Sequence, residues 1–148
     1  MPVLTDRAVR AVLRCSMVAE VATLSAKSRP FVTPLWFVTS GDALYITTGP
    51  GTWVGRNVME HPEVTLLFYG DRGGRSERIV RVRGTATCHR GLPSWRVLLR
   101  IAVKYYVSLR ELQNARRWGL RRRYYSQVKG GFGYLRVVPR AAEILPWP

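Results

Sequence analysis

The segment from Tyr45 to Val64 holds the residue types best suited to bind an anion. Within it, the run YITTGPGTWVGRN places two hydroxyl side chains at the end of a strand-like stretch, then glycines, then Thr52 as a helix cap. Free backbone N–H groups at a helix start and the guanidinium of Arg56 both attract a phosphate or a carboxylate. The same pattern also fits a turn that binds no ligand, in which Thr52 only caps the helix and Arg56 is solvated. The residues alone leave both interpretations open.

Other catalytic signatures are absent from the sequence. Only two histidines occur, His61 and His89, and no serine or cysteine lies in a nucleophile elbow, so a hydrolytic triad has no support. P-loop and dinucleotide fingerprints are also missing. Cys15 and Cys88 have no spacing typical of a metal site, and we expect no metal. A chain so poor in acid and base groups, with no catalytic residue to name, is better suited to hold a cofactor that brings its own reactivity.

The charge balance also favours an anionic partner. Twenty-four Lys and Arg residues against nine Asp and Glu residues give a net charge of +15, which attracts nucleic acid, anionic lipid or a phosphorylated or carboxylated small molecule. The helical period after Leu92 sets an apolar face against a basic one. The apolar face is Trp95, Leu98, Leu99, Ala102, Val103 and Tyr106, and the basic face is Arg96, Arg100 and Lys104. Together with a later cluster of arginines (Arg116, Arg117, Arg121, Arg122 and Arg123), this helix indicates an alternative function, a nucleic-acid- or membrane-binding module.

The elements that would position the anion site are mostly strands. A helix capped by Thr5 leads into β-branched runs separated by short polar turns, which predict antiparallel hairpins. We expect strands at 17–24, 31–38, 43–47, 63–69, 79–88, 134–138 and 142–145, and helices at 52–60 and from 92 to about 125. Pro139 is expected to break the last strand. These strands predict a closed or half-closed barrel, which protects strand edges, in a single domain, 1–148, with a helical insertion at about 92–129.

Two runs of the sequence resemble a known family. VATLSAKSRPFVTPLWFVTSGDALYITTGPGTWVGRNVMEHPEVTLLF, followed by VRVRGTATC, is similar to the pyridoxamine 5′-phosphate oxidase-like family of FMN-binding split β-barrels. That family includes a branch that uses the deazaflavin coenzyme F-420. The resemblance covers Val18 to about Cys88 well and the final run GYLRVVPRAAEILPW moderately. Leu92 to Lys129 matches no family pattern.

The resemblance implies both a fold and a function. The fold is expected to be mainly β with α, a split antiparallel β-barrel with flanking helices, assembled as a homodimer whose sites are shared between subunits. The expected function is that of an oxidoreductase in which FMN or F-420, each with equal support, exchanges hydride with a small organic substrate. A non-catalytic flavin- or haem-binding protein of the same fold is the alternative.

The resemblance also assigns cofactor-binding residues one by one. A strand is expected to meet the flavin ring, and the turn and helix to bind phosphate. These residues are Thr33, Pro34, Leu35 and Trp36 on the strand, and Thr47, Thr48, Thr52, Trp53, Arg56 and Asn57 in the turn and helix. The family commonly has a lysine two residues after Thr52, where this chain has Val54. One phosphate charge is therefore absent, and Arg81, Arg83 or a residue of the second subunit would have to replace it.

The sequence carries few signs of export. Its start, Met1 to Val12, includes Asp6, Arg7 and Arg10 and lacks the apolar core of a secretory signal. No run of eighteen apolar residues could span a bilayer. Since the two cysteines are expected as free thiols, we expect a cytoplasmic protein.

Overall fold

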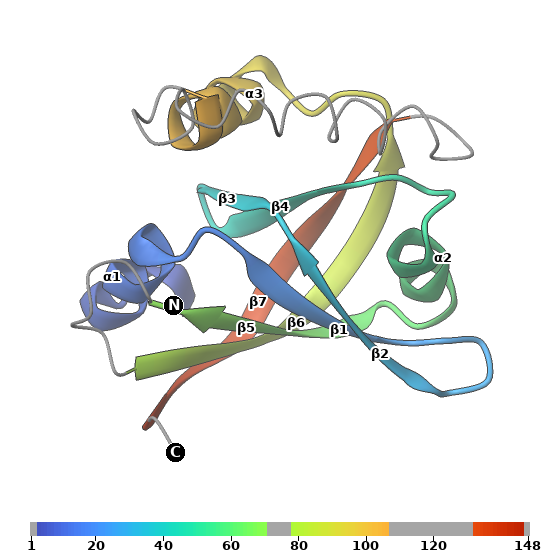
Figure 1. The fold of residues 1–148 in the computed structure, drawn as a ribbon, viewed down its shortest axis with the longest axis horizontal. Helices are drawn as coiled ribbons and strands as arrows, with labels where there is room; N and C mark the ends of the chain where they lie inside the picture. Colours follow the sequence, from blue (N-terminus) through green and yellow to red (C-terminus); the bar gives the residue numbers. More distant parts are fainter. Residues whose placement is uncertain (1–2, 71–77, 107–131, 147–148) are drawn as a thin grey trace.

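The computed structural model of the chain describes residues 3–70, 78–106 and 132–146. Its elements, in chain order (Figure 1), are η1 (Val3–Thr5), α1 (Arg7–Cys15), β1 (Ala19–Leu24), β2 (Pro30–Leu35), β3 (Phe37–Ser40), β4 (Ala43–Thr48), α2 (Trp53–Glu60), β5 (Glu63–Tyr69), β6 (Arg78–Arg90), α3 (Trp95–Ile101), η2 (Ala102–Tyr106) and β7 (Gly133–Pro146). The segment η2 is π-helical and continues α3 directly.

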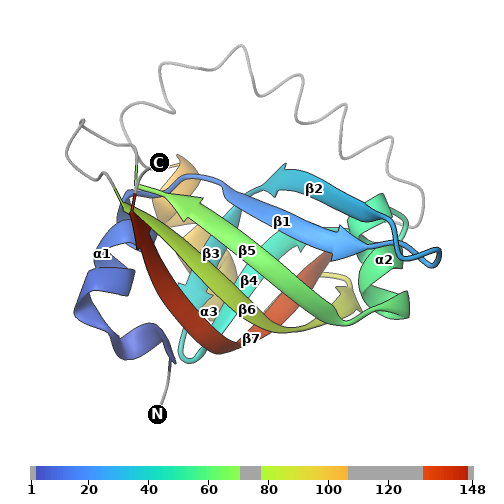
Figure 2. The ribbon, with the colours of Figure 1, turned by 90° about the horizontal axis from the view of Figure 1, so that it is seen from below.

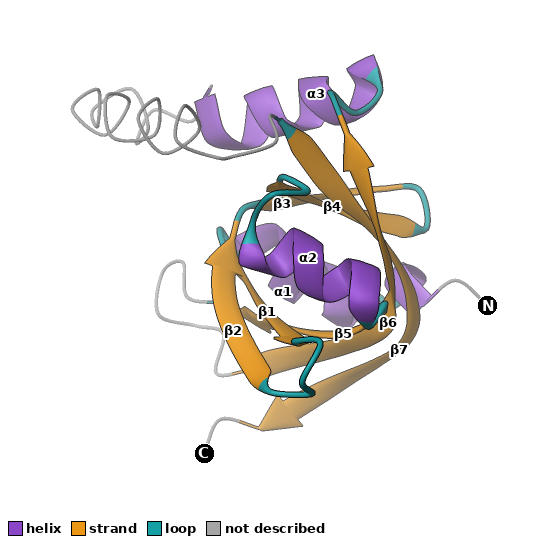
Figure 3. Ribbon diagram, turned by 90° about the vertical axis from the view of Figure 1, so that its right-hand side faces the viewer, coloured by secondary structure: helices purple, strands orange, loops and turns teal. Residues whose placement is uncertain are grey.

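The strands of the described residues form one antiparallel sheet of seven strands in the order β2-β1-β5-β6-β7-β4-β3. The sheet curls into the split barrel that the sequence predicted. Figure 2 shows β1, β2, β5, β6 and β7 side by side, and Figure 3 shows the strands surrounding α2 and α1. The helices α1 and α2 lie at opposite ends of the barrel (Figure 1), while α3 lies outside it, beside β3 and β4.

The core of the barrel is built from side chains that alternate between buried and more exposed positions along β5 and β6. Val64, Leu66 and Phe68 point inward on β5, and Val80 and Val82 do so on β6, while their sequence neighbours are exposed or half-buried. Residues of α1 and α2 join the same cluster from the two ends. Since each such side chain contributes about 1.5–3 kcal/mol when buried, this alternation decides which face of the sheet is inside.

The predicted strand 31–38 is two strands, and the break between them sets the two edges of the sheet. β2 pairs with β1 up to Leu35, β3 pairs with β4 from Phe37, and Trp36 lies between them. The Trp36 carbonyl accepts a hydrogen bond from the Thr47 amide of β4 at 3.1 Å. Because the chain changes partners at Trp36, β2 and β3 occupy the two edges of the sheet.

Two local predictions were wrong. Asp6, and not Thr5, caps α1, since its carboxylate accepts hydrogen bonds from the amides of Ala8 at 2.8 Å and Val9 at 3.3 Å. Pro139 does not end a strand, because β7 continues through it. The register with β6 shifts there, so that Gly84 pairs with Pro139, and a bulge of this kind tolerates a residue without an N–H group.

The apolar face predicted for the helical segment after Leu92 is only partly turned inward: Leu98 and Ala102 are half-buried, but other members of that face are exposed. Trp95, Leu99 and Val103 are 69%, 56% and 58% exposed, whereas Val97 and Tyr105 are buried. The helix is turned so that its side-chain donors reach carbonyl groups at the β3 edge of the sheet, which has no neighbouring strand among the described residues. Residues 107–131, with the predicted arginine cluster and most of the predicted insertion, lie outside the described residues. No helix in the described ranges is long and apolar enough to cross a membrane.

Candidate functional site

The turn between β4 and α2 is organised by two threonine hydroxyl groups. Thr52 Oγ1 donates to the Gly49 carbonyl at 2.7 Å and accepts from the Gly55 amide at 3.0 Å, which caps α2. Thr48 Oγ1 lies 2.8 Å from Thr52 Oγ1. A hydroxyl has one hydrogen to donate, so Thr48 donates to Thr52 and both hydrogens are used inside the turn. A bound anion would have to be held chiefly by other donors, unless these hydroxyl groups rotate.

A close backbone contact gives the turn its shape. A Cβ atom on Gly55 would lie 2.3 Å from the Gly49 carbonyl oxygen, and one on Gly133 would lie 2.4 Å from the His89 carbonyl oxygen and 2.9 Å from Pro50 Cδ. The glycines therefore let strands and helix approach one another closely. This packing role of the glycines was not predicted from the sequence.

The exposed side of the turn carries the candidate anion donors. The Arg56 guanidinium carbon lies 4.3 Å from the centre of the Trp53 ring, and that ring stacks on Phe31 of β2, with centroids 6.0 Å apart and planes 8° apart. Arg56 is therefore oriented by a cation–π contact and is not simply solvated. Among the described residues, the amides of Trp53 and Val54 have no hydrogen-bond partner. These two N–H groups and the guanidinium lie at the positive end of the helix dipole.

Val54 and Asn57 face the interior of the barrel. Val54 is 3% exposed and packs in the main core cluster. Asn57, also 3% exposed, donates from Nδ2 to Thr23 Oγ1 at 3.0 Å and so joins α2 to β1. The position where the family commonly has a lysine is thus a core position in this chain, and the cofactor-binding role predicted for Asn57 stays a prediction beside its structural one.

The predicted ring-binding strand divides at its end. Thr33 is half-buried, Pro34 exposed and Leu35 buried on β2, whereas Trp36 stacks on Tyr105, with ring centroids 4.3 Å apart. Trp36 and Thr47 line a mostly apolar cavity of about 290 Å³ between β4, the start of β7 and α3. Thr47 and Thr48, adjacent on a strand, point to opposite faces. The structure therefore places Thr48 in the turn and Thr47 at this cavity.

The arginines expected to replace the missing charge have another partner. Arg81 and Arg83 of β6 both donate to the carboxylate of Glu143 on β7. The hydrogen bond from Arg81, followed by its charge, lowers the pKa of Glu143. Both guanidinium groups are thus engaged on β6 and β7, and Arg56 remains the cation at the turn.

A second cavity, of about 340 Å³, was not foreseen from the sequence. It lies between α1, η1, β3 and α3, and it is lined by Arg10 and Arg14 on one side and Arg100 and Lys104 on the other. Each pair is four residues apart on its own helix, which is a signal present in the sequence. Nothing in the sequence indicates that the two helices face each other.

Comparison with known proteins agrees with the architecture. Residues 5–143 match the family model described as pyridoxamine 5′-phosphate oxidase. No curated protein matches the sequence.

Three solved structures are similar to the chain, all at low sequence identity. An F420 reductase is 21% identical, with a TM-score of 0.63 over 90% of this chain and 94% of that one. A pyridoxamine 5′-phosphate oxidase-related, FMN-binding protein from Nostoc punctiforme is 14% identical, with a TM-score of 0.65 over 97% and 84%. HutZ, a heme storage protein from Vibrio cholerae, is 17% identical, with a TM-score of 0.61 over 99% and 95%. At these identities the likeness establishes the fold alone.

Proposed function

Because the chain belongs to the pyridoxamine 5′-phosphate oxidase family of split β-barrels, we propose that it binds FMN or the deazaflavin F-420 and uses it to exchange hydride with a small organic substrate. The observation that carries the proposal is the start of α2. There, the amides of Trp53 and Val54, which have no partner among the described residues, and the oriented guanidinium of Arg56 present donors to an anion at one helix end.

The residues proposed to bind the cofactor form two parts of the site, one charged and one aromatic. Arg56 and the first amides of α2 hold the phosphate, and the stacked pair Trp53 and Phe31 offers an aromatic surface beside it. The backbone of Thr33 to Leu35 on β2, and of Trp36 directly after it, meets the ring. The bound cofactor supplies the hydride chemistry, while the protein supplies orientation and charge.

The cofactor is identified most directly by absorption. We expect the purified protein, or the protein after incubation with FMN or F-420, to show the visible band of a flavin or a deazaflavin. A colourless protein that retains neither cofactor would overturn the proposal. A Soret band would instead support the haem-binding alternative. This alternative is motivated by the structural likeness to the heme storage protein.

The segment α3–η2 favours an apolar partner over a nucleic acid. Its outward residues Trp95, Leu99 and Val103 are apolar, whereas Arg100 and Lys104 donate to carbonyl groups of β3. An exposed apolar surface of this kind suits contact with a second copy, and we propose a homodimer. Light scattering should give twice the monomer mass, and a monomeric mass at micromolar concentration would contradict it.

The two cysteines of the chain bear on its expected cellular location. Cys15 and Cys88 are both free thiols, and burial raises the pKa of Cys88, with the charge of Arg90 opposing that rise. Unpaired cysteines suit a reducing compartment. We therefore propose a cytoplasmic protein, which fractionation of cells that express the tagged chain would test.

A further inference from the structure

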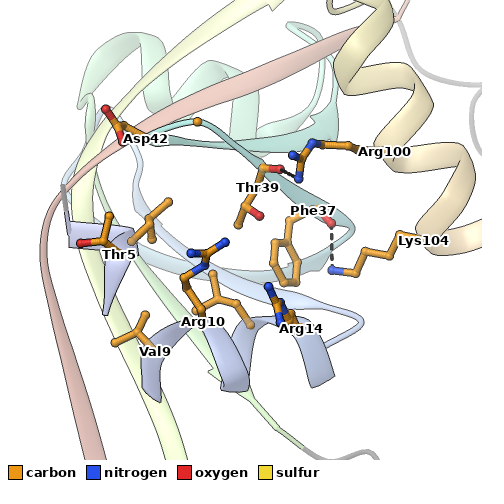
Figure 4. A pocket seen from close by; sticks show the side chains of 12 residues that line it. Thr5, Val9, Arg10, Arg14, Phe37, Thr39, Asp42, Arg100 and Lys104 are labelled. Carbon is orange, nitrogen blue, oxygen red and sulfur yellow. Dashed lines mark hydrogen bonds between the residues drawn. The ribbon is translucent and has the colours of Figure 1, made fainter. Parts of the chain in front are cut away.

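The cavity between α1 and α3 brings together cations from two helices that are far apart in the sequence. Figure 4 shows Arg10 and Arg14 reaching in from α1 and Arg100 and Lys104 from the opposite side, with β3 between them. The floor is apolar: Val9, Leu13 and Phe37 are buried, as is Leu4. A charge above such a floor is less well solvated than one in open water, so its attraction to an anion is stronger.

The positively charged side chains that line this cavity outnumber the carboxylates. Asp42 is the one carboxylate among the described residues that line it. Arg10, Arg14 and Arg100 form no ion pair with a described residue. On the surface of β6 and β7, by contrast, Arg81, Arg83 and Arg140 each contact a glutamate.

Two cations are held in place by β3 itself. Arg100 Nη1 donates to the Thr39 carbonyl at 3.0 Å, and Lys104 Nζ donates to the Phe37 carbonyl at 3.1 Å while lying 3.5 Å from the centre of the Phe37 ring. A guanidinium has five N–H donors, so Arg100 keeps most of its donors for a ligand. Arg10 and Arg14 make no side-chain hydrogen bond within the described residues, and their guanidinium forks match phosphate and carboxylate groups.

This arrangement has a cost that a ligand would remove. Like charges four residues apart on a helix destabilise it by a few tenths of a kcal/mol, and this repulsion occurs on α1 and again along α3 and η2. We propose that the cavity is an anion-binding site for a compact molecule with two or more negative charges, borne by phosphate or carboxylate groups. It lies at the α1 end of the barrel, apart from the start of α2 (Figure 1), and it does not depend on the proposed flavin.

The size of the cavity agrees with a small molecule. About 340 Å³ is near the lower limit of pockets that bind small ligands. A compact phosphate ester or a tricarboxylate fills such a space. Net attraction from several cations also predicts that binding weakens as salt is added.

Calorimetric titration of the full-length protein at low ionic strength tests the site. Pyrophosphate is the phosphate probe, citrate the carboxylate probe, and sodium chloride of equal ionic strength the blank. We expect at least one probe to bind at this cavity, with at least a tenfold weaker affinity in the Arg10→Gln, Arg14→Gln double variant. Arg56→Ala should leave this binding unchanged, which separates the site from the start of α2.

The control removes the same amount of charge from positions outside the cavity, one on α1 and one on α3. Arg7→Gln with Arg96→Gln changes residues that do not line the cavity, and it should preserve the affinity. The probe that binds identifies the chemical source, phosphate or carboxylate. Two results would overturn the proposal: neither probe exceeds the blank, or the two double variants lose affinity equally. The ligand-free Arg10→Gln, Arg14→Gln protein should unfold at no lower temperature than the wild type, because it loses repulsion and no bond.

Discussion

The turn before α2 and the segment α3–η2 both satisfy backbone polar groups next to strands, but they do so over very different sequence distances. In the turn, the hydroxyl of Thr52 bonds residues three or four positions away. In α3–η2, Arg100 reaches a carbonyl 61 residues away, and Tyr105 reaches one 88 residues away. Local contacts form with little loss of chain entropy, whereas distant contacts require the rest of the fold.

The Tyr105 hydroxyl shows how much one distant contact can do. It accepts a hydrogen bond from the Phe37 amide at 3.0 Å, and the Met17 and Phe37 carbonyl oxygens lie 2.8 Å and 2.9 Å from it. The side chain is fully buried and stacks on Trp36. The comparison thus predicts that α3–η2 stabilises the barrel edge more than its surface position suggests.

Truncation of Tyr105 should have the largest effect. Tyr105→Ala removes a buried aromatic ring and should lower the free energy of unfolding by about 3–5 kcal/mol. Tyr105→Phe keeps the ring and leaves the Phe37 amide unpaired, for a loss of about 1–3 kcal/mol. Urea denaturation measures both. If the two variants match the wild type, α3–η2 contributes nothing to the edge and the comparison fails.

Gly55→Ala should have the next largest effect. Its Cβ atom would lie 2.3 Å from a backbone oxygen, so the turn must move, at a cost of about 3 kcal/mol. Gly41→Ala is the control: its φ is 60° but it has no atom within 4 Å, so only about 1 kcal/mol of backbone strain is expected. Thermal unfolding should rank the two variants in this order. The reverse order would show that the close contact with Gly49 is not required.

Arg56→Ala separates ligand binding from folding in the same turn. Loss of a charged hydrogen bond of about 1.5–3 kcal/mol should weaken binding of the flavin or deazaflavin about tenfold to a hundredfold. The unfolding temperature of the cofactor-free protein should change little, because Arg56 is exposed. Arg78→Ala, at the start of β6, is the matched control. A loss of stability without a loss of affinity would favour a purely structural role for Arg56.

Substitution of Glu143 should give the smallest effect, because its contact with Arg81 spans 62 residues but lies on the exposed surface. Its pKa is lowered from about 4.5 by the Arg81 hydrogen bond. Its stabilising contribution is therefore present above about pH 4.5 and is lost as the pH falls through the lowered folded-state pKa. The small stability difference between wild type and Glu143→Gln should shrink below pH 4.5 in urea titrations. A difference independent of pH would exclude this ion pair as its source.

The ion pair between Arg81 and Glu143 shows that a large sequence distance does not by itself make a contact strongly stabilising. Arg81 and Glu143 are as distant in sequence as Arg100 and Thr39, yet solvent screens their attraction. Sequence distance therefore determines whether a contact can be predicted. Burial determines how strongly it stabilises the fold.

The elements whose residues interact with near neighbours could be predicted from the amino-acid sequence. Alternation along 63–69 and 79–88 predicted β5 and β6, and Thr52, directly after the glycines of the turn, marked the start of α2. The resemblance to the split-barrel family was visible in the same runs, and the family model confirms it. These features were predictable because the period of a strand and the cap of a helix are local properties.

Features that depend on partners far along the chain became visible in the folded structure and not before. Nothing near Trp36 indicates that the strands on either side of it pair at opposite edges of the sheet. The period of α3 does not tell which face turns inward, because β3 offers carbonyl groups that draw in Arg100 and Lys104 in preference to Leu99. The same packing sets Arg10 and Arg14 opposite them. The threonines, the glycines and Arg56 of the turn could be identified from the sequence. The basic cavity could not, because it forms only when two helices pack on one barrel.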